Sequence, residues 1–456
     1  MSRNLLIGIK SIIAFKILID ESTSSIILHT IIEKLNKHII NIREKVVRYK
    51  TLIQNFSYLS ALQIFNLLLP LITYPYLIRV LGKETYGLVV FAQAIIGYLL
   101  ILVGFGFNMS ATKDVSIHRD NKEKLSEIVS SVLIIKSVFF IISLIILVVV
   151  LWLIPQVKDY KLLFYLTMWM CLYDVLFPQW YFQGIEQMKF ITYITLVSRL
   201  IFFGLIFVFI HSPSDYLFMP VISGLGAIIA GLISLYIIFY IHRIQFSKQP
   251  LPVLKKYFKE SIPIFVSNVS IKLYGSTNKV LVGAFIGMAE IAYYDLAEKI
   301  VSVIKLPQSI VGQTIFPKIS RDKNLQFVKK YFYISLIINV ILTGLTVAFT
   351  KPIILLLGGS TMLDAKYIVW ILVFTTPFVA MSNIWGFQLL IPFGYNKAFQ
   401  KVILSSSFVY IILMISIWQL YYFSIINISL VNLIIEIFVA FGFLYQCKKN
   451  NLWRKI

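Results

Sequence analysis

Hydrophobic residues recur along the whole chain in runs long enough to cross a lipid bilayer. A transmembrane helix needs about 20 mainly apolar residues, because the hydrocarbon core is about 30 Å thick and each residue adds about 1.5 Å. The pattern predicts an all-α polytopic membrane protein with about twelve transmembrane helices. Their predicted ranges are 56–80, 86–108, 129–154, 161–184, 190–211, 216–241, 259–287, 290–317, 330–351, 366–392, 398–420 and 425–446.

Basic residues are concentrated in every second segment between these runs. They lie in 113–124, at Lys189, in 243–256, in 318–330, at Lys397 and in the tail 448–455. The alternate segments, such as 82–86 and 421–424, are short and carry little charge. Because Lys and Arg favour the cytoplasmic side of a membrane, both termini are expected in the cytoplasm.

Six predicted spans precede a basic segment at 242–258, and six follow it. An even number of spans gives both halves the same orientation, which predicts two parallel pseudo-repeats around a central cavity. The expected organisation is a bundle at 56–241, a cytoplasmic linker at 242–258, a bundle at 259–446 and a cytoplasmic tail at 447–456.

Residues 1–55 differ from the rest because their apolar runs are interrupted by charge. We interpret them as a cytoplasmic extension, which is either an amphipathic interfacial segment or the product of a start-site error. They lack the uninterrupted apolar core and small-residue cleavage site of a secretory signal.

Two of the predicted transmembrane helices carry charge along one face. Asn268, Lys272, Ser276 and Lys279 follow one another at helical spacing in the seventh span. Charge in hydrocarbon costs about 2.5–3.5 kcal/mol or more, so it normally faces a partner or a water-filled cavity. We expect Lys272 and Lys279 to line the cavity; the alternative is that their heads reach the membrane interface.

The eighth span combines both signs of charge on one face. Asp295, Glu298 and Lys305 share it, and Lys299 follows Asp295 by one helical turn. The two carboxylates either respond to a proton or cation in the cavity, or simply neutralise the lysines, as in pairs of Asp295 with Lys299 or Glu298 with Lys305.

Other charges lie inside or at the ends of the remaining spans. Arg79 ends the first span, where it either anchors the helix at the interface or contributes to the cavity. Asp174 and Arg199 lie within neighbouring spans and either pair with each other or line the cavity. Lys136 lies near the end of its span, so its head is expected to reach the interface.

Composition excludes several other classes of protein. The chain has 456 residues, of which 59% are hydrophobic, and a mean hydropathy of +0.85. The net charge of +22 lies between apolar runs rather than on a nucleic-acid-binding module. The two cysteines and five scattered histidines lack metal-ligand spacing, so no metal is expected. There is no phosphate-cradling loop for ATP.

Several motifs in a fixed order resemble the bacterial flippases for O-antigen and capsular polysaccharide, of the Wzx type, in the multidrug/oligosaccharidyl-lipid/polysaccharide superfamily. The resemblance begins at about residue 55 and continues to the C-terminus. It is carried by LPLITYPYLIRVLGKETYGLVVFAQAI (69–95), FPQWYFQGIEQMKFITYI (177–194), IPIFVSNVSIKLYGSTNKVLVGAFIGMAEIAYYDLAEKIV (262–301) and FPKISR (316–321).

The resemblance implies a function as well as a fold. Such proteins move polyprenyl-diphosphate-linked oligosaccharide repeat units from the cytoplasmic to the periplasmic leaflet of the bacterial inner membrane by alternating access, for O-antigen, capsule or exopolysaccharide assembly. The expected partners are this lipid-linked substrate, the bilayer, and a polymerase and chain-length regulator of the same pathway. No cofactor is expected beyond H⁺ or Na⁺ as a coupling ion.

On this hypothesis, the candidate site residues form two groups, the cations and the carboxylates. The substrate-binding cations are Lys272, Lys279, Lys305, Arg199 and Arg79, and the coupling or cavity carboxylates are Asp295, Glu298 and Asp174. A diphosphate-sugar head group cannot cross hydrocarbon unaided, and lysines can bind the diphosphate through charge-assisted hydrogen bonds.

Two other functions remain open at this stage. A cation-coupled multidrug antiporter of the same superfamily typically has an acidic residue in its first span, where this chain has Gln63 and Asn66. A membrane polysaccharide polymerase or glycosyltransferase would need a long external loop with catalytic residues, and the largest outer segment here is about 351–365.

Overall fold

The structure is a computed structural model that describes residues 24–153 and 155–453. The chain forms two compact units, Met1–Ser57 and Tyr58–Ile456, and each is described by itself. The described part of the first unit is helical and forms the start of helix α2 (Ser24–Gly104). Residues 1–23 of the predicted extension lie outside the described residues, and the amphipathic interpretation of this extension stays a prediction.

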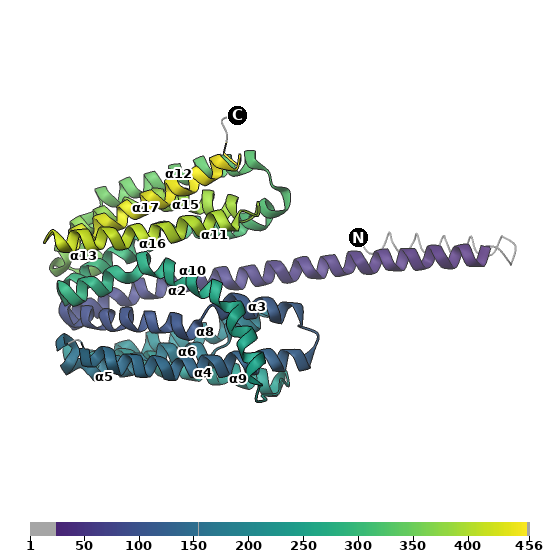
Figure 1. The fold of residues 1–456 in the computed structure, drawn as a ribbon, viewed down its shortest axis with the longest axis horizontal. Helices are drawn as coiled ribbons and strands as arrows, with labels where there is room; N and C mark the ends of the chain where they lie inside the picture. The colour runs from purple at the N-terminus through teal and green to yellow at the C-terminus, as the bar shows by residue number, and fades with distance from the viewer. Residues whose placement is uncertain (1–23, 154, 454–456) are drawn as a thin grey trace. The chain divides into compact units, whose positions relative to one another are not determined.

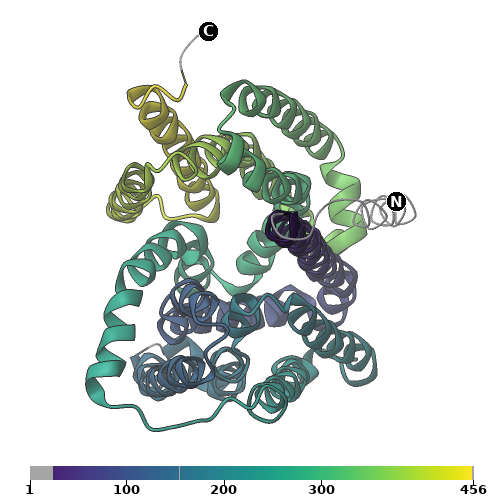
Figure 2. The same cartoon turned by 90° about the vertical axis from the view of Figure 1, so that its right-hand side faces the viewer.

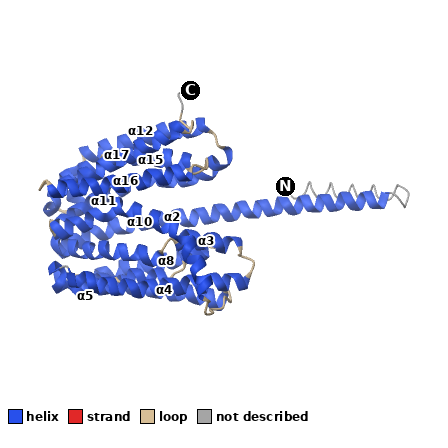
Figure 3. Ribbon diagram, viewed as in Figure 1, coloured by secondary structure: helices blue, strands red, loops and turns tan. Residues whose placement is uncertain are grey.

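The second unit consists of helices and the turns between them, and Figure 3 shows no strand among the described residues. Its first half contains the rest of α2 and the following helices: α3 (Phe107–Ile117), α4 (Lys122–Leu153), η1 (Pro155–Tyr160), α5 (Lys161–Thr167), α6 (Trp169–Leu176), α7 (Gln179–Gly184), α8 (Met188–Phe209), η2 (Pro213–Leu217), α9 (Phe218–Tyr236) and η3 (Ile237–Ile241) (Figure 1).

The second half begins after the extended segment that follows η3. It contains α10 (Leu251–Phe285), α11 (Met288–Asp322), α12 (Leu325–Ala348), α13 (Thr350–Gly358), η4 (Ser360–Ala365), α14 (Lys366–Val373), α15 (Thr375–Ser382), η5 (Asn383–Leu390), α16 (Asn396–Gln419) and α17 (Ile425–Lys449).

The helices account for the predicted membrane spans. Nine segments of the described residues are long and apolar enough to cross a membrane. One of them, Ser60–Ile117, is 58 residues long and covers the second predicted span and most of the first, with a kink at Gly82 between them. The φ of +76° at Gly82 lies in the left-handed region that favours glycine. The charged helices α10 and α11 are not among the nine, but each has 35 residues and is long enough to cross.

The helices of the second unit form two bundles around a central region. Helices before residue 242 pack mainly against one another, as in the pairs α8–α9 and α6–α9, and those after 250 do the same, as in α16–α17 and α11–α14. Figure 2 shows the two groups, one in blue and teal and the other in green and yellow. The expectation of two six-helix bundles is confirmed, and the predicted boundaries between them stay a prediction.

Helix α10 connects the two bundles. Near its start, Phe258 and Phe265 stack on Phe105 of the first half, with ring centroids 4.8 and 4.5 Å apart. Further along α10, the Asn278 side chain accepts a hydrogen bond from Tyr410 of α16, at 2.7 Å. Most of the charged face of α10, from Asn268 to Ser276, lies between these two attachments and therefore at the boundary of the bundles.

The bundles also meet at the end of the second unit where Gly82 lies. Gly87 packs so closely on α11 that a β-carbon built on it would lie 1.8 Å from the carbonyl oxygen of Met288. The Lys83 ammonium donates a hydrogen bond to the Tyr293 hydroxyl at 2.6 Å, and this hydroxyl donates to Asp364 at 3.1 Å. These contacts hold the two halves together at this end.

A Gly87→Ala substitution is therefore expected to destabilise the protein. The added methyl group collides with backbone, which cannot rotate away, so α2 and α11 must separate; overpacking of this kind costs about 1–3 kcal/mol. The midpoint of thermal unfolding of the purified protein in detergent should fall. Gly204→Ala and Gly344→Ala are matched controls, because a β-carbon at either position meets no atom within 4 Å. An unchanged midpoint for Gly87→Ala would contradict the close approach.

Candidate functional site

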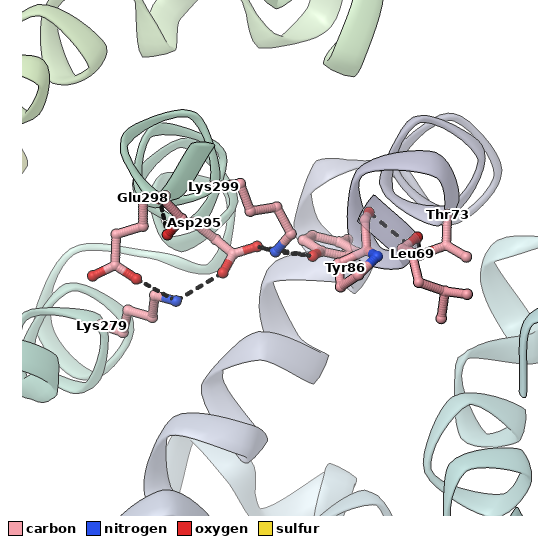
Figure 4. Close-up of polar contacts among 9 residues, drawn as sticks. Leu69, Thr73, Tyr86, Lys279, Asp295, Glu298 and Lys299 are labelled. Carbon is pink, nitrogen blue, oxygen red and sulfur yellow. Dashed lines mark hydrogen bonds and ion pairs between the residues drawn. The ribbon is translucent and has the colours of Figure 1, made fainter. Parts of the chain in front are cut away.

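The charged faces of α10 and α11 meet in one cluster of ion pairs. The Lys279 ammonium of α10 lies 2.7 Å from Oδ1 of Asp295 and 2.6 Å from Oε2 of Glu298, both on α11 (Figure 4). Asp295 and Glu298 follow one another by three residues, which places both carboxylates on the same face of the helix. Lys279 therefore binds two carboxylates at once.

A second set of contacts ties this cluster to the first half of the chain. Asp295 also pairs with Lys299, one turn further along α11, and its Oδ2 accepts a hydrogen bond from the Tyr86 hydroxyl at 2.8 Å. The Lys299 ammonium lies 5.1 Å from the ring centroid of Tyr74, as a cation–π contact. Figure 4 shows Tyr86 reaching Asp295 from α2.

The cluster is electrically balanced and adjoins a small cavity. Its two carboxylates, Asp295 and Glu298, match its two ammonium groups, which removes most of the cost of burying charge in an apolar region. The side chain of Asp295 is only 6% exposed, whereas that of Glu298 is 31% exposed. The cavity of about 250 Å³ is lined by these four residues, Asn66, Leu67, Pro70, Leu71 and Ser302.

Lys272 lies in a different cavity, about 390 Å³ in volume, at the boundary of the two bundles. Both halves of the chain line this cavity. The first half contributes Gly104, Asn108 and Asp174, and the second half contributes residues that include Asn268, Lys272 and Ser276. No carboxylate of the described residues forms an ion pair with Lys272. Its ammonium is therefore available to an anion that enters this cavity.

Asp174 forms an ion pair that the sequence did not suggest. Its Oδ2 lies 2.8 Å from the ammonium of Lys136 on α4, which also donates to the Asp174 carbonyl at 2.8 Å. The expectation that Lys136 extends to the membrane interface is wrong, because the residue is 1% exposed. Asp174 pairs with Lys136 rather than with Arg199, since α4 and α6 pack side by side.

A Lys136→Met substitution should destabilise the first-half bundle. It removes the partner of Asp174 and leaves a carboxylate in an apolar site; breaking a buried pair typically costs about 3–5 kcal/mol, and the lower value is expected because the Asp174 side chain is 20% exposed. Thermal unfolding in detergent measures this loss. The double variant Lys136→Met/Asp174→Leu should recover much of it, and a double variant as unstable as the single one would contradict the ion pair.

The three remaining candidate cations are distributed over the molecule. Arg199 of α8 lines a separate pocket in the first-half bundle. Arg79 is exposed, and its guanidinium donates a hydrogen bond of 2.9 Å to the carbonyl of Leu356 at the end of α13. Lys305 lies further along α11 than the cluster. The structure thus brings together Lys279, Asp295 and Glu298, but not these three.

Tyr74 and Tyr86 belong to the site, although neither was among the site residues expected from the sequence. Both lie on α2, and their rings meet edge to face with centroids 5.2 Å apart. The two tyrosines contact the cluster because α2 packs against α11. The periodicity of polar residues within one helix does not reveal which other helix it packs against. The only sequence signal near them is Gly82, whose kink lets α2 return across the membrane.

The arrangement is suited to the movement of a polar, anionic molecule between two bundles. An unpaired lysine faces a cavity formed by both halves, and the balanced cluster adjoins a second cavity. Together with the membrane-spanning helices, these features indicate the class of protein: a multi-pass membrane transporter.

The comparison with known families agrees with this class. Residues 52–323 match the family described as polysaccharide biosynthesis protein, and the chain belongs to this family. A relative from Escherichia coli (strain K12), named "Putative O-antigen transporter", is 29% identical over 380 residues, which cover 81% of this chain and 90% of the relative.

Solved structures share the fold at low sequence identity. An inward-facing multidrug transporter of the MATE family and MOP superfamily superposes with a TM-score of 0.68 and 14% identity, over 84% of this chain and 95% of that one. The lipid II flippase MurJ, in an inward closed conformation, superposes with a TM-score of 0.66 and 17% identity, over 85% of this chain and 87% of that one. These two similarities show that the chain shares the fold of both transporters.

Proposed function

We propose that this protein flips polyprenyl-diphosphate-linked oligosaccharide repeat units from the cytoplasmic to the periplasmic leaflet of a bacterial inner membrane, by alternating access. The observation that carries the proposal is Lys272, a cation without a carboxylate partner in a cavity formed by both bundles. A diphosphate supplies the missing negative charge through charge-assisted hydrogen bonds. The relative named for O-antigen transport supports the same class of substrate.

Lys279 contributes to the diphosphate site in a second step of this proposal. In the present state its ammonium is bound by Asp295 and Glu298. A diphosphate that approaches from the Lys272 cavity competes with these carboxylates for Lys279. Substrate binding and rearrangement of the cluster are then coupled, because the two lysines lie on the same face of α10.

The carboxylates freed in this way can take up an ion. Asp295 and Glu298 would accept H⁺ or Na⁺ when the diphosphate holds Lys279, which would couple transport to an ion gradient. Reconstituted protein would then transport faster under an imposed gradient of the coupling ion than without one.

The proposal includes an orientation and a pathway. The alternation of basic segments supports an orientation with both termini in the cytoplasm. The substrate's polyprenyl tail stays in the bilayer while its head group crosses between the bundles. A polysaccharide polymerase and a chain-length regulator are the expected downstream partners.

Deletion of this protein in its host is the decisive experiment. We expect loss of the surface polysaccharide, with complete lipid-linked repeat units held on the cytoplasmic face of the inner membrane. Complementation with the wild-type chain should restore export. Repeat units that reach the periplasm but stay unpolymerised would instead indicate a polymerase. Intact polysaccharide together with altered drug sensitivity would favour the cation-coupled antiporter.

A further inference from the structure

A pocket within the first-half bundle contains an arginine that the proposed diphosphate site does not use. The pocket has a volume of about 400 Å³ and is formed by α2, α6, α8 and α9, with Lys299 of α11 at one side. Arg199 lines it, whereas no Asp or Glu does among the described residues. Of the two cations in the lining, Lys299 is paired with Asp295. Arg199 forms no ion pair with any of the described residues.

Aromatic side chains form part of the pocket wall. Trp169 and Tyr173 of α6 lie there, with ring centroids 6.5 Å apart, together with Tyr74 of α2. A glycine fixes the position of the tryptophan, because a β-carbon at Gly224 would lie 3.1 Å from the β-carbon of Trp169. Such rings offer flat apolar faces to the C–H groups of a sugar.

The pocket also contains a buried polar group without a partner. Tyr74 is 1% exposed, and its hydroxyl has no hydrogen-bond partner among the described residues. Gln93 and Ser198 add further hydrogen-bonding groups to the lining. The Tyr74 hydroxyl is enclosed by protein, so Gln93 and Ser198 are the hydrogen-bonding groups that this part of the lining offers to a ligand.

The unpaired arginine determines the charge of that ligand. A guanidinium matches the geometry of a carboxylate, to which it can donate two parallel hydrogen bonds. Within a membrane-spanning bundle, a cation without an ion pair among the described residues favours an anionic ligand in its pocket. The pocket shares Pro70 and Lys299 with the cavity beside the ion-pair cluster, so the two spaces adjoin.

We propose that this pocket is a second substrate subsite, which binds an acidic sugar of the repeat unit. The sugar ring lies against Trp169 and Tyr173, its carboxylate binds Arg199, and Gln93 or Ser198 bonds to a ring substituent. The inference rests on the proposed function and names its substrate class: a lipid-linked repeat unit that contains a uronic acid, with the diphosphate held separately at Lys272.

Transport by the full-length protein in proteoliposomes tests this inference. Two synthetic probes are compared, each a polyprenyl diphosphate with a disaccharide, one containing glucose and the other glucuronic acid. Wild-type protein should flip the glucuronic acid probe roughly tenfold faster, the ratio expected for one strong charge-assisted interaction. Arg199→Gln should slow the glucuronic acid probe much more than the glucose probe, so that the two rates become equal. Lys351→Gln, at an exposed position of α13, is the control and should change neither rate.

Several outcomes would overturn the inference. Equal rates for the two probes with wild-type protein would show that the subsite does not recognise an acidic sugar. Equal slowing of both probes by Arg199→Gln would assign the arginine to the diphosphate or to folding. If wild-type protein moves neither probe, the proposed function itself fails, which distinguishes the two failures.

A binding measurement on wild-type protein covers the case in which Arg199→Gln does not fold. Tryptophan fluorescence in detergent should respond to free glucuronate and not to glucose at the same concentration, and inorganic pyrophosphate should not displace glucuronate. Displacement by pyrophosphate would mean that the pocket is the diphosphate site, and an equal response to glucose would mean that charge is not recognised. Either result contradicts the proposal.

Discussion

Substitution of Lys272 by alanine is expected to abolish most transport while the protein still inserts and folds. Lys272 has no carboxylate partner in the described structure, so its removal leaves no buried charge unpaired. Hydrogen bonds to a charged group contribute about 1.5–3 kcal/mol each, so loss of the ammonium should weaken diphosphate binding roughly 10- to 100-fold. Export of surface polysaccharide in a deletion strain, with membrane levels of the variant measured in parallel, provides the test.

Three further variants serve as comparisons for Lys272→Ala, because they change either the charge at this position or a lysine elsewhere. Lys272→Arg keeps the charge and should retain a substantial part of export. Lys351→Ala removes an exposed lysine of α13 and should have no effect. The double variant Lys272→Ala/Lys279→Ala removes both lysines of the α10 face. Normal export by this variant, fully expressed, would exclude the proposed diphosphate site.

The spans and charged faces were predictable because both follow from spacing within one segment. A run of about 20 apolar residues identifies a membrane-spanning helix without knowledge of its neighbours. In the same way, the spacing of Asp295 and Lys299 by one helical turn was sufficient to suggest their pairing, and the structure contains it.

The partners that come from distant segments were not predictable in this way. Asp174 pairs with Lys136 because α4 and α6 are neighbours, and Glu298 pairs with Lys279 rather than with Lys305. Lys305 lies two turns from Glu298 on the same helix, α11, whereas Lys279 lies on the neighbouring helix α10. Only the packing of α10 against α11 decides between them.

Tyr86 shows a related limit of sequence reasoning. Its hydroxyl holds Asp295 from a helix more than two hundred positions earlier in the chain, and Lys299 donates a hydrogen bond of 3.1 Å to the same hydroxyl. A tyrosine within an apolar run normally indicates packing, and its role in the cluster appears only when the two bundles are placed together.

Substitution of Asp295 by asparagine should cause the largest loss of stability in the molecule. The Asp295 side chain is 6% exposed and neutralises two lysines. Without it, Lys279 retains Glu298, whereas Lys299 retains no carboxylate and contacts only the Tyr86 hydroxyl and aromatic rings. Loss of one partner from a buried pair costs about 3–5 kcal/mol, because the remaining charge is uncompensated. Thermal unfolding in detergent should show the loss, and Glu298→Gln should show a smaller one because Glu298 is more exposed.

A second substitution separates the structural role of Asp295 from its proposed role in coupling. Asp295→Asn/Lys299→Met restores charge balance, since Lys279 and Glu298 then form the remaining pair. We expect this double variant to regain much of the lost stability but not transport, because the carboxylate that exchanges an ion for Lys279 is still absent. If transport returned along with stability, Asp295 would serve only to neutralise charge, and the coupling role would have to be assigned to another carboxylate.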